Sequence, residues 1–149
     1  MIRFRTATID DVPAVLKLLQ DDVLGQGREG ATPHHYAAAF ARMEHEPNNH
    51  LIVGANAENR VVATYQITCI TGLSLRGARR AQIESVRVAS DLRGQGIGKD
   101  MVEDITNRAR AAGCSLVQLT MNTTRTDANR FYERMGFVPS HTGFKLSLD

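Results

Sequence analysis

Apolar and polar residues alternate at the start of the chain, where residues 2–5 predict a strand with one face in water. Apolar residues then recur at helical spacing over residues 12–19, and the pair Thr8 and Asp11 resembles the capping box that begins many helices. A second helical pattern, opened by one proline and closed by another, covers residues 33–46. These patterns predict a strand followed by two helices.

Three apolar runs follow, and their lengths are typical of strands. Residues 51–54 and 61–70 are separated by a short turn and predict a hairpin, and residues 82–88 supply a third strand. A long helical pattern then covers residues 97–109 and is closed by Gly113. The middle of the chain is therefore expected to contain three neighbouring strands and a long helix.

The last part of the chain continues to alternate strand and helix. Residues 116–121 predict a buried strand, residues 127–135 predict a short helix that ends at Gly136, and the tail at 137–148 is strand-like. The full order is β-α-α-β-β-β-α-β-α-β-β. This order predicts an α/β fold with a mixed, mostly antiparallel sheet, and the length of 149 residues fits a single domain over residues 1–149.

Composition narrows the possible function classes. The formal net charge is +2 and the basic residues are scattered, which argues against a nucleic-acid surface. No apolar run approaches the ~20 residues that span a bilayer, so we expect a soluble, cytoplasmic protein without membrane contact. Cys69 and Cys114 lack any metal-ligand or disulfide spacing and are expected to be reduced, buried thiols. The histidines also lack ligand spacing, so no metal site is expected.

Three glycines at alternate positions, Gly94, Gly96 and Gly98, lie between the third of these strands and the long helix. Bare backbone N–H groups at the positive end of a helix bind anions, phosphate above all, and Arg93 adds positive charge at the rim. The spacing fits neither a dinucleotide fingerprint nor a P-loop, because Lys99 occupies the sixth position and no Ser or Thr follows it. A helix entry without a ligand is the alternative, although glycines in a helix each cost stability.

Two segments carry a resemblance to a known family. The pattern R-x-x-G-x-G at residues 93–98 resembles the coenzyme A-binding motif Q/R-x-x-G-x-G/A of the GCN5-related N-acetyltransferase (GNAT) superfamily. The pattern N-x-x-Y-x-x-x-G-F at residues 129–137 resembles its second signature. The likeness covers nearly the whole chain, as in a small bacterial-type single-domain member. Ser90 is the one departure, at a place that often holds proline.

The resemblance implies acetyl-CoA as co-substrate and no metal. It also implies a sheet that splays between its fourth and fifth strands to admit the pantetheine arm. The main-chain amides of the glycine segment would hold the pyrophosphate, and the fourth strand would pair with the pantetheine amides. The residues expected to contact the cofactor are Val86, Arg87, Val88, Arg93, Gly94, Gln95, Gly96, Ile97, Gly98, Lys99, Asn129, Tyr132 and Arg134.

Two residues are expected to be catalytic when an amine attacks the thioester directly in a ternary complex. The resemblance places Tyr132 as the general acid for the departing thiolate. An alkyl amine with a pKa of ~10.4 must lose a proton, and Glu84 is the candidate base, acting directly or through a water. Strand alternation is expected to place Glu84 on the same side as Val86 and Val88. The alternatives are a core tyrosine and a carboxylate that only pairs with an arginine such as Arg87.

The acceptor is expected to be a primary amine of a small molecule that also carries an acidic group. By resemblance, the loop after the first helix forms a wall of the acceptor site. There Asp21, Asp22 and Glu29 favour a cation, and Arg28 can hold a carboxylate or phosphonate. His141 is a further candidate for the cleft, and solvent-facing charges are the alternative for the loop. A peptide or protein N-acetyltransferase and a non-catalytic acyl-CoA sensor are the competing function classes, and the superfamily makes a homodimer the expected assembly.

Overall fold

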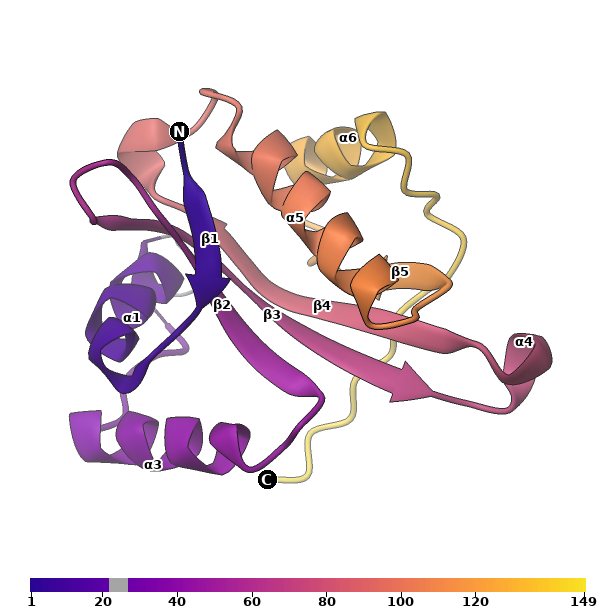
Figure 1. Cartoon of the computed structure of the whole chain (residues 1–149), viewed down its shortest axis with the longest axis horizontal. Coiled ribbons are helices and arrows are strands. Elements are labelled where there is room, and N and C mark those ends of the chain that lie inside the picture. Colours follow the sequence, from indigo (N-terminus) through magenta and orange to yellow (C-terminus); the bar gives the residue numbers. More distant parts are fainter. Residues whose placement is uncertain (22–26) are drawn as a thin grey trace. The chain divides into compact units, whose positions relative to one another are not determined.

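The chain forms a five-stranded sheet in the order β1-β2-β3-β4-β5, in a computed structural model that describes residues 1–21 and 27–149 (Figure 1). The first four strands pair antiparallel, each with the next along the chain. The elements are β1 (Arg3–Thr6), the 3-10 turn η1 (Ile9–Asp11), α1 (Val12–Gln20), α3 (Pro33–Glu44), β2 (Asn49–Ala55), β3 (Val61–Thr71), α4 (Ser74–Gly77), β4 (Arg79–Val88), the 3-10 turn η2 (Ser90–Leu92), α5 (Ile97–Ala111), β5 (Leu116–Leu119) and α6 (Thr126–Arg134).

The chain divides into two compact units, Met1–Gln118 and Leu119–Asp149. The first unit contains the antiparallel strands, the helices α1, α3, α4 and α5 and most of β5. The second contains α6 and the tail. The glycine segment and Tyr132 therefore belong to different units.

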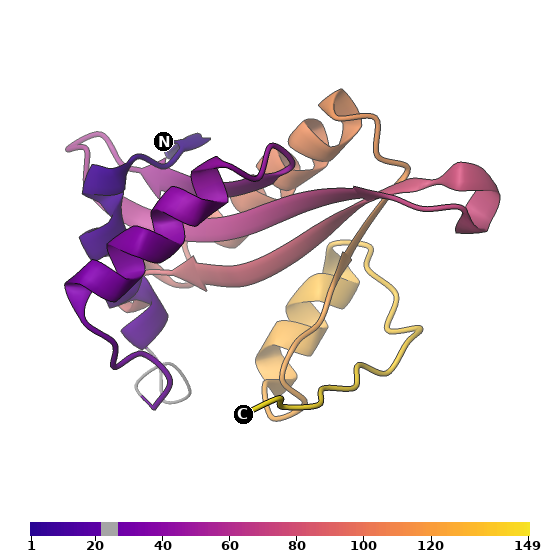
Figure 2. The same cartoon turned by 90° about the horizontal axis from the view of Figure 1, so that it is seen from below.

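Helices cover both faces of the sheet in the first unit. Successive side chains of a strand point to opposite faces. Val53 of β2 belongs to a buried cluster with Val15 of α1 and Phe40 of α3, whereas Ile52 lines a cleft together with residues of α5. Tyr65 of β3 is fully buried and its hydroxyl donates a hydrogen bond to a carboxylate of α5. Figure 2 shows α5 on one side of β3 and β4 and α1 on the other.

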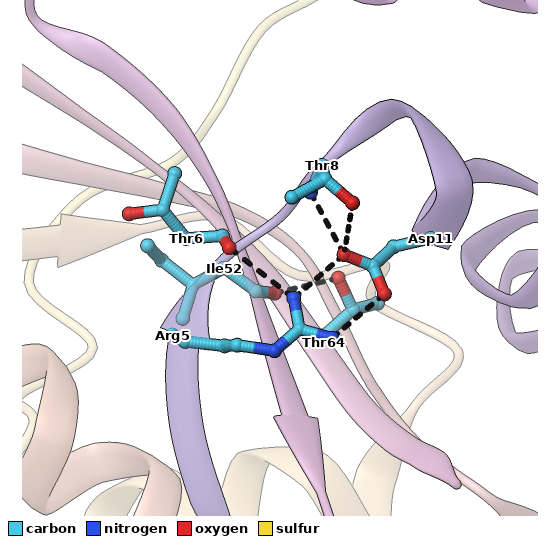
Figure 3. A network of polar contacts seen from close by, with 6 residues as sticks. All are labelled: Arg5, Thr6, Thr8, Asp11, Ile52 and Thr64. Carbon is cyan, nitrogen blue, oxygen red and sulfur yellow. Dashed lines mark hydrogen bonds and ion pairs between the residues drawn. The ribbon is translucent and has the colours of Figure 1, made fainter. Parts of the chain in front are cut away.

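A partly buried ion pair joins the first strand to the start of α1 (Figure 3). Arg5 donates two hydrogen bonds to the carboxylate of Asp11, at 2.7 and 2.9 Å. The same carboxylate accepts the backbone N–H of Thr8 at 2.7 Å and so caps the turn that precedes the helix. The bonds from Arg5 hold the pKa of Asp11 below its usual range, although burial opposes this shift. Asp11 therefore stabilises the fold in its charged form.

We expect the variant Asp11→Asn to lower the free energy of unfolding by about 1–3 kcal/mol at neutral pH, as for other hydrogen bonds to charged groups. Because the pKa of Asp11 is lowered in the folded state, the stabilising contribution is complete above the unfolded pKa of ~3.9 and is lost as the pH falls through the folded value. Urea unfolding of both proteins across this pH range measures the difference. If the difference in free energy of unfolding between the two proteins stays constant from neutral to acidic pH, the carboxylate does not have this role.

Most elements lie where the sequence predicts them. Thr8 and Asp11 form the predicted capping box. Thr32, just before the helix predicted from residue 33, accepts the N–H of His35 and caps α3. Gly113 and Gly136 follow the long and the short helix with φ angles of 77° and 93°. The predicted α/β class with a mixed sheet is confirmed.

The tail departs from the prediction. Residues 137–149 contain no strand, and the alternating side chains of Phe144, Leu146 and Leu148 are between 87% and 93% exposed. Alternation gives this segment an apolar face, but a strand also needs a neighbour for its backbone N–H and C=O groups. Within the described residues no strand pairs with the tail.

Burial is lower than predicted at two further places. β5 is half-buried along its length and ends at Leu119, two residues earlier than expected. Cys69 and Cys114 are half-buried instead of buried. In the part of the chain that the structure describes, no helix is both long and apolar enough to cross a bilayer.

Candidate functional site

The glycine segment forms a turn at the start of α5, exposed from Gly94 to Gly96. Gly94 and Gly96 adopt left-handed φ angles of 77° and 87°, which glycine reaches without the steric cost of a Cβ atom. Gly96 is the N-cap of α5, and its carbonyl accepts the N–H groups of Lys99 and Asp100. Among the described residues, no group accepts the backbone N–H of any residue from Gly94 to Gly98. Five consecutive donors at a helix N-terminus form a ready site for an anion.

Polar contacts from distant parts of the chain hold this turn in place. Arg60 donates two hydrogen bonds to the carboxylate of Asp91, at 2.9 and 3.0 Å. Asp21, at the end of α1, accepts the backbone N–H of Ser90 at 3.0 Å, and its carbonyl accepts from Arg93 at 3.2 Å. The bond from Ser90 lowers the pKa of Asp21. The start of the predicted acceptor loop is therefore attached to the glycine segment.

A bulge in β4 changes which side chains share a face. Ser85 has a left-handed φ of 55°, and the register with β3 shifts at this point. Glu84 lies opposite Gln66 of β3, and Val88 lies opposite Ala63 of β3. Gln66 and Ala63 are three residues apart along β3, so their side chains point to opposite faces of the sheet. Glu84 therefore does not share a face with Val88, and the expectation from simple alternation is wrong. The extra residue in the bulge is the physical reason.

Glu84 is an exposed carboxylate on the same face as a group of hydrogen-bonded amides. Gln118 of β5 donates to Gln82 at 2.7 Å and accepts from Arg80 at 3.1 Å. Gln66, opposite Glu84, donates to an asparagine of β2 at 2.8 Å. These amides cannot be recognised as a group from the sequence, because glutamines spaced along different strands form no local motif.

β5 accompanies only the first half of β4. Ser115 N–H donates to the carbonyl of Arg79 at 2.8 Å, and Gln118 bonds to Gln82. Residue numbers increase in the same direction along β4 and β5 from one bonded pair to the next, so the two strands run parallel. Because β5 ends at Leu119, the segment from Glu84 to Val88 extends past it. The half-buried residues Val86, Arg87 and Val88 lie in this extension.

The predicted acceptor loop is partly described. Asp22 lies outside the described residues. Glu29 is half-buried and accepts a hydrogen bond of 2.8 Å from the hydroxyl of Tyr36, which raises the pKa of that tyrosine. The carbonyl of Glu29 accepts from Gln20 at the end of α1, and Arg28 is exposed. Tyr36 was missed by sequence reasoning, since it fits equally well as an apolar position of its helix.

The residues of the second signature lie in the second unit. Asn129 and Tyr132 are half-buried, three residues apart on α6 and so on neighbouring positions of one face, and Arg134 is exposed at its end. The ring of Tyr132 makes edge contacts with Phe131 and Phe137, with centroids 5.2 and 5.5 Å apart. These contacts fix the ring plane. The remaining candidates are His141, exposed beside Ser140, and, in the first unit, the exposed Arg93, Gln95 and Lys99 with the buried Ile97.

In the described part of the chain, no three His, Cys, Asp or Glu side chains are grouped so that they could hold a metal ion.

Comparison with known proteins identifies the family. The acetyltransferase (GNAT) family matches residues 13–137, which is most of the chain. The protein therefore belongs to the GNAT acetyltransferase family.

Three relatives give this assignment detail. A transcriptional regulator from Bacillus halodurans C-125 is 42% identical, with a TM-score of 0.94 over 99% of this chain and 100% of that one. A protein from Agrobacterium tumefaciens str. C58, named as an acetyltransferase, is 30% identical to this chain. Its TM-score is 0.86, over 97% of this chain and 99% of that one. An aminoalkylphosphonate N-acetyltransferase from Salmonella typhimurium is 39% identical over 67 residues, 45% of this chain. The matched segment spans only 44% of the length of that enzyme.

Proposed function

We propose that the protein is an acetyl-CoA-dependent N-acetyltransferase that acetylates the primary amine of a small molecule. The observation that carries the proposal is the row of five backbone N–H groups from Gly94 to Gly98 that have no acceptor among the described residues. Such a row suits the pyrophosphate of coenzyme A, the co-substrate of this family. The extension of β4 beyond β5 supports pairing of Val86 and Val88 with the pantetheine amides. Arg93, Asn129 and Arg134 are proposed as further contacts of the cofactor.

The chemistry needs two proton transfers. The amine nitrogen forms a bond to the acetyl carbon while the carbon–sulfur bond breaks. Glu84 takes the proton of the amine through a water, which suits an exposed carboxylate. Tyr132 gives a proton to the departing thiolate, because a phenol and a thiol have similar pKa values. A backbone N–H near Val86 polarises the thioester carbonyl.

The acceptor proposed is a small amine that also carries an acidic group. Glu29, oriented by Tyr36, provides negative charge for the ammonium group before it loses its proton. The exposed Arg28 provides the partner for a carboxylate or phosphonate. Asp22 and His141 are further candidate contacts. The activity named for the Salmonella relative, on an aminoalkylphosphonate, supports this class of acceptor.

A panel of acceptors tests the proposal. Thiol release from acetyl-CoA is followed with aminophosphonates, amino acids, simple alkyl amines, aminoglycosides and peptides. We expect the largest kcat/KM for a small amine with an acidic group. Activity confined to peptides would support the peptide N-acetyltransferase instead. Binding of acetyl-CoA without turnover on any member would favour a non-catalytic sensor.

Replacing Arg28 with alanine tests the anion contact. We expect KM for an aminophosphonate to rise about ten-fold or more, the loss of one charge-assisted hydrogen bond, with little change for a simple alkyl amine. The matched control is Arg42→Ala, an exposed arginine at the end of α3. Equal increases in KM for both acceptors would argue against the contact.

We also propose a homodimer in the cytoplasm as the working form. A closed symmetric pair is the commonest assembly of soluble proteins. The exposed apolar side chains of Leu73 and Leu75 favour it.

A further inference from the structure

The hairpin of β3 and β4 projects beyond the end of its pairing with β2. Pairing with β2 ends at Thr68, but β3 and β4 continue to pair as far as Thr71 and Arg79. The connection contains α4 and lies at the far end of the two strands (Figures 1 and 2). We call residues 70–79 the hairpin arm.

The tip of the hairpin arm exposes apolar side chains. Leu73 is 97% exposed and Leu75 is 68% exposed, and Ile70 on the adjoining strand is 45% exposed. Isolated apolar residues on a surface are ordinary, but a cluster at the end of a projecting element marks an interaction site.

The backbone of the tip is held in an unfavourable conformation. Leu75 and Arg76 both adopt left-handed angles, with φ of 53° and 62°, and neither is glycine. Two consecutive left-handed residues of this kind are rare and persist only where the surroundings require them. Hydrogen bonds from Gly77 N–H to the carbonyl of Leu73 and from Gly72 N–H to the carbonyl of Ala78 close the turn. The tip is therefore a shaped element that presents its leucines outward.

A cleft lies at the base of the same hairpin. It has a volume of about 370 Å³, and its apolar lining includes the strand residues Ile52 and Ile67 together with Ala111 and Ala112 at the end of α5. Cys69 also lines it. We call this cleft the base cleft.

The two arginines of the base cleft already have polar partners. Arg108 pairs with Asp104 at 2.8 Å, and Arg79 donates to Thr71 and to an asparagine at 2.8 and 3.2 Å. An apolar group could therefore enter the cleft without leaving these charges unpaired.

We propose that two copies of the chain dimerise by exchanging hairpin arms, with Leu73 and Leu75 of each copy seated in the base cleft of the other. Residue 69 in the cleft and residue 73 at the tip are four positions apart in the chain, so at most roughly 14 Å separates them. This separation is the same in both copies. Two arms lying side by side in opposite directions therefore bring each tip to the partner's cleft, and a two-fold axis closes the assembly. The inference rests on the homodimer proposed above.

Charge substitutions at the tip test the exchange. In the double variant Leu73→Asp with Leu75→Asp, we expect the dimer dissociation constant from sedimentation equilibrium to rise roughly 30-fold or more, as for loss of interface hot spots. Both positions are exposed, so the fold is retained, which circular dichroism checks. The matched control is Ile9→Asp, an apolar side chain that is 49% exposed outside the arm, and it leaves the constant unchanged. A double variant that dimerises like the wild type overturns the exchange but not the homodimer.

Disulfide trapping identifies what occupies the base cleft. With mild oxidant, Leu73→Cys should form a covalent dimer through Cys69 of the other copy, and the product should disappear when Cys69 and Cys114 are both serine. A disulfide between two copies of residue 73 would overturn the proposal, since the tips would then meet each other. Trapping of Cys69 by Leu146→Cys within one chain would also overturn it, with the tail as occupant. A wild type that is monomeric contradicts both this exchange and the homodimer, while thiol release still reports acetyl transfer independently.

Discussion

Replacing Gly96 with aspartate should raise the dissociation constant for acetyl-CoA by about 100-fold or more, equivalent to ~2.7 kcal/mol. Gly96 lies in the middle of the five N–H groups that have no acceptor among the described residues, and its φ is 87°. Apart from the adjoining backbone, no atom of the described residues lies within 4 Å of a Cβ built there. Aspartate tolerates left-handed angles better than most residues, so the fold survives while a negative charge enters the proposed pyrophosphate site. Isothermal titration calorimetry measures the effect.

Gly113→Asp is the matched control for strain. Gly113 has a φ of 77°, also has open space around its Cβ position, and lies at the opposite end of α5. Both variants lose stability for the same steric reason, but only the one at Gly96 should lose affinity. Equal affinities for acetyl-CoA in the two variants would mean that the pyrophosphate does not lie against the glycine segment.

Replacing Tyr132 with phenylalanine should lower kcat by at least about ten-fold, as expected when a general acid is lost. The dissociation constant for acetyl-CoA should change little, because the ring keeps its contacts with Phe131 and Phe137. Single-turnover kinetics at saturating acceptor separates this effect from binding and product release.

Tyr65→Phe removes the same atom from a tyrosine with a different role. The hydroxyl of Tyr65 is buried against Asp104, so its loss should lower stability and leave kcat of the folded protein unchanged. If Tyr132→Phe behaves in the same way as Tyr65→Phe, the hydroxyl of Tyr132 has no part in the proton transfer.

The sequence predicted the features that depend on local chemistry. The start of α5 beside Gly94 and Gly96 follows from residue types at fixed spacing. The same holds for the box of Thr8 and Asp11. In each case the residue that determines the conformation lies within a few positions of its partner, so a single window of sequence contains the information.

Features that depend on long-range pairing could not be predicted in this way. The bond between Asp21 and Ser90 joins residues that are 69 positions apart. The bulge at Ser85 has a positive φ, but no glycine at this position indicates it in the sequence. The bulge places Glu84 and Val88 on opposite faces of the sheet. The tail shows the converse, because Phe144 and its alternating neighbours have the pattern of a strand without forming one. The alternation of apolar residues indicates that a segment can form a strand. Whether it does so depends on a neighbouring strand elsewhere in the fold.

The most direct test of the account is an amide-resolved NMR titration of the protein with acetyl-CoA. The central claim is that the backbone N–H groups of Gly94 to Gly98, unpaired among the described residues, bind the pyrophosphate. The account predicts saturable shifts of these five amides, and the same shifts with coenzyme A, which carries the same pyrophosphate but lacks the acetyl group. Unchanged amide signals from Gly94 to Gly98 at millimolar ligand would contradict it.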